Sequence, residues 1–390
     1  MNDYKKALAE VGAYVPKLLL PEKNVDLHRF SVIACDQYSA QPEYWDQVEA
    51  LVGESPSALR MMLPEAWLSK SGDETIAQIN DTMQRYLHTQ VLTEIGETLV
   101  YLHRRTSSGV RKGLVVALDL EQYDFAPGAQ SLIRATEGTI VDRLPPRMKI
   151  RRDAPLEMPH IMVLVDDRSN LLMGLLEQNL PHLQQLYDFS LMQHGGHLTG
   201  WRVDHASLLL RIAEVLHTLR TQGNGFLYAM GDGNHSFATA KACWDEIKQT
   251  LSPAQQAEHP ARFGLVELVN LYDPALRFEP IHRLLMGVDP AAVQADLGFD
   301  AQCPPSLQVL QPLLDTWCAA HSGVEQEYIH GADECRALGN APDRLAIVFP
   351  SFDKDALFDV VRRDGAFARK SFSMGEAIDK RYYLECRKIR

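Results

Sequence analysis

The residues best suited to chemistry in this sequence are gathered in one short segment. That segment contains Gly231, Asp232, Gly233, Asn234, His235 and Ser236. Asp232 can accept a proton and His235 can relay one. The two glycines would let an anionic group approach the backbone closely. We therefore interpret this segment as the candidate site of the chain, with Asp232 and His235 as its reactive groups.

Two predicted elements would hold this segment in place. The apolar run 226–230 is long enough for one buried strand, and the amphipathic pattern over 237–248 predicts a helix. Asn234 or Ser236 could cap that helix. A strand, a glycine turn and a helix point free N–H groups and the positive end of the helix dipole at an anion. The turn is therefore predicted to bind phosphate or another anion.

A second group of candidate residues lies earlier in the chain. Glu137 stands between a threonine and a glycine, and Arg143 opens a cationic run continued by Arg147, Lys149, Arg151 and Arg152. Arginine can neutralise phosphate oxygens. We retain Glu137 and Arg143 as site residues and interpret the later cations as a solvated face. Asp36 follows a short strand, where it could either belong to a site or cap a loop.

Histidine and cysteine give no clear metal site. His194 and His197 flank two glycines, but further ligands are not evident nearby. The six cysteines are scattered without a CxxC pair, which favours free thiols in a reducing compartment. No metal ligands are assigned.

Composition excludes several classes of partner. The chain has 390 residues and a net charge of -12, which argues against general binding to nucleic acid or to anionic membranes. No apolar run approaches the roughly 18 residues of a membrane span, and the first residues lack an apolar signal segment. We expect a cytoplasmic protein whose partner is a small anionic metabolite.

The order of predicted elements indicates the fold class. Strands alternate with helices, which favours an α/β fold, or an α+β fold, with a mixed sheet. We expect a core over residues 1–250 that carries the Asp-Gly-Asn-His turn and a C-terminal subdomain over 251–390 packed on it. The boundary between them carries no linker signal.

Taken together, these stretches resemble domain-of-unknown-function family 1015. The signature of that family is a strand, then D-G-H-H-R-Y, then a helix, and it is matched here by Asp232-Gly233-Asn234-His235-Ser236-Phe237. Its second marker, H-E-x-T followed by D-R-L, is approximated by residues 135–139 and by Asp142-Arg143-Leu144. The resemblance covers most of the chain and implies that Glu137, Arg143 and Asp36 gather around Asp232.

The D-G-H-H-R box is in turn similar to the G-E-R-R box of the ParB and sulfiredoxin superfamily. Members of that superfamily bind nucleotides, and some phosphorylate free serine with an acidic residue as base. This second resemblance implies a ParB-like strand-turn-helix core. The chain departs from the pattern at Asn234, in place of histidine, and at Ser236, where the loss of arginine removes a bidentate phosphate fork.

These observations predict an enzyme that transfers a phosphoryl group to or from a hydroxylated small molecule, with Mg²⁺ and a nucleotide as cofactors. Asp232 would be the general base or a carboxylate ligand of the metal. His235 would orient the substrate or relay a proton. Glu137 and Asp36 would supply further carboxylates. Two alternatives stay open. One is a non-catalytic regulator that binds a nucleotide or metabolite, and the other is a metal-dependent hydrolase that uses His194, His197 and Asp232.

Overall fold

A computed structural model describes residues 3–39, 41–126 and 128–390, without the side chains of residues 69, 70 and 143. The chain forms two compact units. The first comprises residues 1–135, 139–276 and 376–390, and the second comprises 136–138 and 277–375. The division falls after Leu276, beyond the boundary expected near residue 250. The reason is that the strand over 263–270 pairs inside the sheet of the first unit.

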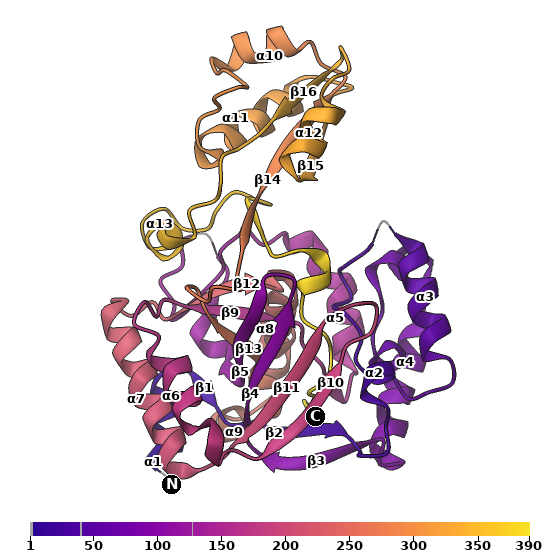
Figure 1. Cartoon of the computed structure of the whole chain (residues 1–390), viewed down its shortest axis with the longest axis vertical. Coiled ribbons are helices and arrows are strands. Elements are labelled where there is room, and N and C mark those ends of the chain that lie inside the picture. Colours follow the sequence, from indigo (N-terminus) through magenta and orange to yellow (C-terminus); the bar gives the residue numbers. More distant parts are fainter. Residues whose placement is uncertain (1–2, 40, 127) are drawn as a thin grey trace. The chain divides into compact units, whose positions relative to one another are not determined.

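A mixed sheet forms the centre of the first unit (Figure 1). Its strands, in hydrogen-bonded order, are β10 (Gln185–Ser190), β11 (His197–Val203), β4 (Leu99–Thr106), β5 (Gly109–Asp119), β13 (Phe263–Asn270), β9 (Met162–Val165), β12 (Tyr228–Asp232), β7 (Ile133–Arg134) and β6 (Tyr123–Asp124). Short β1 (Ala13–Tyr14) also pairs with β5. Strand β12 is antiparallel to β9 and parallel to β7, so it is an interior strand, as predicted. The expected α/β class with a mixed sheet is confirmed.

Helices cover both faces of this sheet because successive strand residues point into two different cores. In β4, Leu99 and Tyr101 enter one core, while Val100 and Leu102 enter the other. The first core is covered by α1 (Asp3–Glu10), α6 (Leu171–Asn179), α7 (Ala206–Gln222) and α8 (Asn234–Lys248). The second is covered by α2 (Leu27–Phe30), α3 (Pro42–Val52) and α4 (Asp73–His88). Burial on both faces explains why the interior strand β9 is apolar throughout.

The smaller elements of the first unit complete these layers. Helix α5 (Leu144–Arg152) packs on α8, and short α9 (Pro253–Glu258) follows α8. Two ribbons of paired strands lie outside the main sheet: β2 (Lys17–Pro21) with β3 (Leu92–Glu97), and β8 (Leu156–Glu157) with β18 (Arg387–Lys388).

The last segment of the chain, Glu376–Arg390, belongs to the first unit and is held there by buried ion pairs. Arg381 contacts Glu267 at 3.1 Å and Glu385 at 2.5 Å, and all three side chains are almost fully buried. Arg387 binds the buried carboxylate of Glu157, which also receives Arg151. Burial raises the pKa of Glu157, but Arg387 and Arg151 outweigh it and hold that pKa below its ordinary value. The segment is therefore an integral part of the unit.

The second unit has a small antiparallel sheet of its own. Strand β14 (Phe278–Met286) pairs with β15 (Glu325–His330), β16 (Arg344–Ile347) and β17 (Phe372–Met374). The helices of this unit are α10 (Pro290–Leu297), α11 (Leu307–Ala320), α12 (Ala332–Leu338) and α13 (Leu357–Asp364). Its core joins the sheet to α10 and α11 through Leu285, Val293, Leu310, Leu314 and Ile347.

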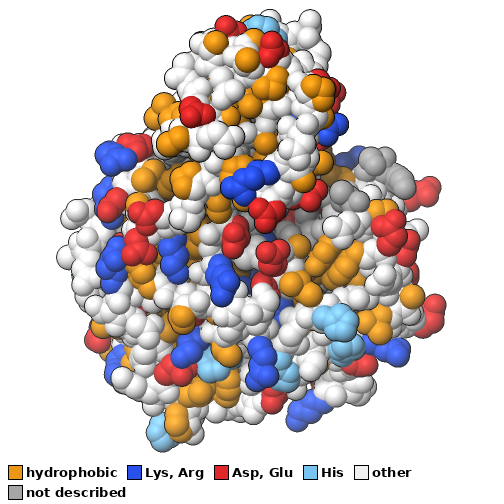
Figure 2. Space-filling view, turned by 45° about the horizontal axis from the view of Figure 1, so that its top comes forward, with side chains coloured by type: hydrophobic (Ala, Val, Ile, Leu, Met, Phe, Trp, Pro, Cys, Tyr) orange, Lys and Arg blue, Asp and Glu red, His pale blue; other side chains and the backbone are white. Residues whose placement is uncertain are grey.

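Two surface properties bear on the expected partners. Within the described residues, no helix combines the length and the apolar character needed to cross a membrane. Figure 2 shows acidic and basic side chains interspersed over the visible face, without a large basic area.

Candidate functional site

The predicted strand, turn and helix are present as β12, Gly233 and α8. Asp232 is the last residue of β12, Gly233 caps the helix, and α8 begins at Asn234. Gly233 has φ +79° and lies so close to β9 that a Cβ atom would stand 2.9 Å from Cγ1 of Ile161. Only glycine fits this combination of left-handed backbone and close approach. Its N–H group donates to Oδ1 of Asp232 at 2.9 Å, which fixes the carboxylate at the helix entrance.

A lysine from the last segment of the chain meets this carboxylate. Nζ of Lys380 lies 3.3 Å from Oδ2 of Asp232, and the two side chains are 9% and 18% exposed. Lys380 also lies close enough to Asp36 to lower its pKa. Two carboxylates that are 196 residues apart in the sequence thus both lie near Lys380. Asp36 and Asp232, both predicted from the sequence, belong to one charged cluster.

The backbone explains how Asp36 and Lys380 are brought together. The N–H of Ala34 donates to the carbonyl of Arg381 at 3.0 Å, and the N–H of Tyr383 donates to the carbonyl of Val32 at 2.8 Å. These bonds align the segment before Asp36 with the segment after Lys380. The ion pairs of Arg381 described above then hold the last segment in register.

A buried histidine and tyrosine extend the cluster beyond Asp36. Nδ1 of His160 is 2.8 Å from the hydroxyl of Tyr383, and its Nε2 lies 3.9 Å from Oδ1 of Asp36. Burial raises the pKa of Tyr383 well above its ordinary value, so the phenol keeps its proton and can donate it to Nδ1. Nε2 is thus the ring nitrogen of His160 that faces Asp36.

The ionisation of Asp36 and Cys35 follows from this environment. Burial raises the pKa of Asp36, but His160, the Gln37 side chain and Lys380 outweigh it, and the net pKa is lowered. Asp36 is therefore a carboxylate at neutral pH. Burial raises the pKa of the neighbouring Cys35 to about 12, so its thiol is protonated at neutral pH and is unsuited to act as a nucleophile.

The first turn of α8 presents polar groups beside this cluster. No side chain caps the helix, so its first N–H groups point outward with the positive end of the helix dipole. Oδ1 of Asn234 is buried and has no hydrogen-bond donor within the described residues. Nε2 of His235 accepts a bond from the N–H of Ile140 at 3.4 Å, which places the proton of a neutral His235 on Nδ1. The turn can thus receive an anion, and Asn234 can receive a hydroxyl donor.

The remaining predicted residues are placed as follows. Gly231 lies within β12, and Ser236 is the third residue of α8. The backbone of Arg143 ends a short 3₁₀ turn, Val141–Arg143, but its side chain lies outside the described part of the chain. Glu137 belongs to the second unit, where it pairs with Phe367 through a β-bridge and lies near the buried Arg283. Of the earlier candidates, the structure joins Asp36 to Asp232 through Lys380.

The histidines considered for metal binding lie in and beside the loop between β10 and β11. His194 has φ +59° in that loop, and Nε2 of His197 binds Asp188 on the adjacent strand. Across residues 3–39, 41–126 and 128–390, no group of three or more His, Cys, Asp and Glu side chains is arranged to hold a metal ion.

Three residues of the cluster were not found from the sequence: His160, Lys380 and Tyr383. His160 stands just before the apolar strand β9, and its neighbours in the sequence give no sign of a site. Lys380 and Tyr383 lie in a cationic and aromatic segment near the end of the sequence, where no pattern indicates a partner. One signal was available for His160 itself: it is a polar residue next to the end of an apolar strand, and strand ends position site residues in α/β folds.

Comparisons with known proteins identify a family but no activity. A model of the family described as "Protein of unknown function (DUF1015)" matches residues 19–316. None of the curated proteins compared with the chain is significantly similar to it. Among solved structures, a conserved hypothetical protein from Pyrococcus furiosus matches 69% of this chain and 94% of its own, with 10% sequence identity and a TM-score of 0.36.

Proposed function

The chain belongs to the DUF1015 family of proteins of unknown function, and we propose that it is a small-molecule phosphotransferase. It would transfer a phosphoryl group between a nucleotide and the hydroxyl group of a small metabolite. The observation that carries this proposal is the ion pair between Lys380 and Asp232 at the uncapped N-terminus of α8.

The cluster contains groups that suit both the phosphoryl donor and the hydroxyl acceptor. The N–H groups of α8 and the ammonium of Lys380 suit the negative oxygens of a phosphoryl group. The buried Oδ1 of Asn234 suits the hydroxyl of the acceptor, since a buried acceptor without a donor costs free energy. Asp232 immediately precedes the N-terminus of α8 and pairs with Lys380, so its carboxylate is next to both groups.

The transfer step can be written with these residues. The hydroxyl oxygen of the acceptor attacks the terminal phosphorus of the nucleotide, and the bond from that phosphorus to the bridging oxygen breaks. The proton of the hydroxyl passes to Asp232, and the nucleoside diphosphate leaves with the bridging oxygen. Lys380 and the first N–H groups of α8 stabilise the charge on the transferring group, which is the main contribution of proteins to phosphoryl transfer.

The carboxylates also fit the magnesium ion that such nucleotides carry. Mg²⁺ is usually held by one or two carboxylates together with substrate phosphates and water. Asp36 and Asp232 supply two carboxylates that share Lys380, and the pKa of Asp36 is lowered, as a metal-binding carboxylate requires. Bound there, the ion would neutralise phosphate charge.

The proposal includes a resemblance of this strand, turn and helix to those of ParB-like proteins. In that superfamily an arginine of the box contacts phosphate, and here the corresponding position is Ser236. Lys380 is a cation at the same turn that comes from a different part of the chain. We assign to Lys380 the charge that the missing arginine would supply.

The test is a search for turnover with the purified full-length chain. ATP, ADP and pyrophosphate are each combined with free serine and similar hydroxylated metabolites, with Mg²⁺ and in both directions, and ³¹P NMR follows the phosphorus species. A new phosphomonoester together with the nucleoside diphosphate is the expected result. Saturable nucleotide binding without any product would instead identify a non-catalytic regulator and would refute the enzymatic proposal.

A further inference from the structure

A second cluster of cations lies at the opposite end of α8 from Asp232. A cleft there is lined by Arg151, Arg152, Ala240, Cys243, Glu246, Ile247, Ala261, Ile389 and Arg390. Cys243 is nine residues beyond Asn234, so at about 1.5 Å per residue the cleft is roughly 14 Å along the helix from the turn. It is therefore distinct from the site of the proposed phosphotransferase.

The arginines of this cleft are only partly neutralised by neighbouring carboxylates. Arg152 is paired with Glu246 at 3.0 Å. Arg151 must share the buried Glu157 with another arginine. Among the described residues, the ion pair of Arg390 is a long contact of 3.8 Å with Asp153, whose side chain is 74% exposed.

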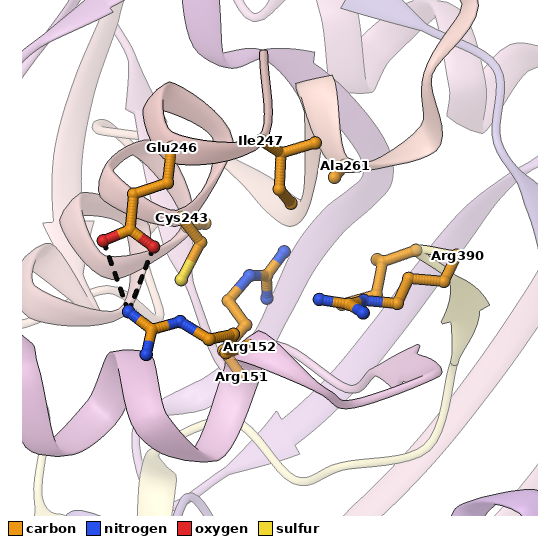
Figure 3. Close-up of a pocket in the computed structure, with 9 residues that line it drawn as sticks. Arg151, Arg152, Cys243, Glu246, Ile247, Ala261 and Arg390 are labelled. Atoms are coloured by element: carbon orange, nitrogen blue, oxygen red, sulfur yellow. Dashed lines mark hydrogen bonds and ion pairs between the residues drawn. The ribbon is translucent and has the colours of Figure 1, made fainter. Parts of the chain in front are cut away.

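The geometry brings two of these cations face to face. Figure 3 shows the guanidinium groups of Arg151 and Arg390 pointing toward each other, while Arg152 turns away to Glu246. Like charges facing each other repel, and the apolar side chains of Ile389 and Ala261 in the lining reduce the screening by water. An anion between the two guanidinium groups would remove this repulsion and accept hydrogen bonds from both.

A purely structural role accounts for only part of the cluster. Arg151 and Arg152 lie in the last turn of α5, where cations interact favourably with the helix dipole. Arg390 belongs to neither α5 nor α8 and follows β18 in the last segment. Its approach to Arg151 is opposed by charge and is not explained by either helix.

We propose that this cleft binds a small oxyanion, either inorganic phosphate or the phosphate group of a small metabolite, between Arg151 and Arg390. The planar guanidinium group donates two parallel hydrogen bonds to such oxygens, which favours phosphate over a monatomic anion. The site is independent of the activity proposed above, because it shares none of the residues assigned to it.

The test is calorimetric titration of the full-length chain at low ionic strength, once with inorganic phosphate and once with glycerol 3-phosphate. Arg390→Gln should weaken one class of phosphate sites at least tenfold, the loss expected for a charge-assisted hydrogen bond. Arg29→Gln is the matched control, because Arg29 is equally exposed and has a similarly long contact, 3.6 Å from Asp26. The ligand that binds more tightly identifies the source of the oxyanion.

Glu246→Gln provides a test in the opposite direction. It removes the one carboxylate that lines the cleft and releases Arg152, so phosphate should bind severalfold more tightly. A merely structural cluster would not gain affinity in this way. If Arg390→Gln lowers the melting temperature, Arg390→Lys takes its place, because it keeps the charge but loses the two parallel hydrogen bonds. The absence of saturable phosphate binding, or binding that Arg390→Gln and Glu246→Gln both leave unchanged, would overturn the proposal.

Discussion

Replacement of Lys380 by methionine tests whether the charged cluster exists in solution. Lys380→Met keeps an unbranched apolar side chain of similar volume and removes the charge. Asp232 then loses its partner at 3.3 Å, and Asp36 loses a neighbouring cation. We expect the variant to be less stable because two partly buried carboxylates are left without the lysine that separates their charge.

The magnitude follows from the distance and the burial. At 3.3 Å and an effective dielectric constant of about 20, the gross attraction is about 5 kcal/mol. Desolvation of the two charges offsets much of it, so the expected net loss is about 1–3 kcal/mol. Asp232→Asn should restore part of this loss when added to Lys380→Met. The double-mutant cycle should therefore give a coupling energy of about 1–2 kcal/mol.

The assay is urea-induced unfolding followed by tryptophan fluorescence. Trp45 and Trp244 are fully buried in the first unit and report on its unfolding. Lys388→Met is the control from the same segment: Lys388 lies 3.7 Å from Glu94, with both side chains more than 40% exposed, and should cost less than about 1 kcal/mol. Equal costs for the two lysine variants, with no coupling to Asp232, would refute the ion pair.

Three further predictions concern single positions. The pKa of Glu157 is lowered in the folded state, so the ionised carboxylate stabilises the fold fully above pH ~4.5. This contribution to the free energy of unfolding is lost as the pH falls through the lower pKa of the folded state. Glu157→Gln should therefore make the free energy of unfolding depend less on pH in the acid range. A stronger dependence in that variant would contradict this assignment. The Cys35 thiol, with its pKa near 12, should react with iodoacetamide at pH 8 roughly a thousandfold more slowly than an ordinary exposed thiol, and mass spectrometry can compare it with the exposed Cys303. Similar rates would show that Cys35 is not shielded. Gly233→Ala should lower the free energy of unfolding by about 2–3 kcal/mol. Gly298 also has a positive φ but lies in open space, so Gly298→Ala should lower it by about 1 kcal/mol. Thermal melts in which Gly298→Ala is the more destabilising variant would exclude a packed turn at Gly233.

The sequence predicted the site residues that lie within a locally recognisable strand, turn or helix. The apolar run before Asp232, the glycine at 233 and the helical pattern after it are local signals, and β12 and α8 begin within two or three residues of the predicted positions. The predicted cap was wrong, because Gly233 is the N-cap and Asn234 and Ser236 lie inside the helix. The α/β class followed from the same kind of pattern, since hydrophobic periodicity reports which faces are buried. Asp36 could be proposed because it follows a short extended segment.

The partners of these residues could not be predicted, because they depend on long-range packing. Lys380 reaches Asp232 only because the last segment returns to the first unit, where Arg381 binds Glu267. Nothing local in the sequence couples positions so far apart. The same return explains why His160 reads as part of a strand: its hydrogen-bond partner, Tyr383, is 223 residues away.

The most direct test of the proposed site is Asp232→Asn, with turnover and stability measured on the same preparation. The substitution keeps the shape of the side chain and an oxygen that can accept from the Gly233 N–H, but it removes the charge that accepts the proton. We expect the rate of phosphoryl transfer to fall about 10²- to 10⁴-fold, while the free energy of unfolding falls by about 1–2 kcal/mol, the coupling energy of the ion pair with Lys380. An unchanged rate would contradict the account, because Asp232 would then contribute to stability alone.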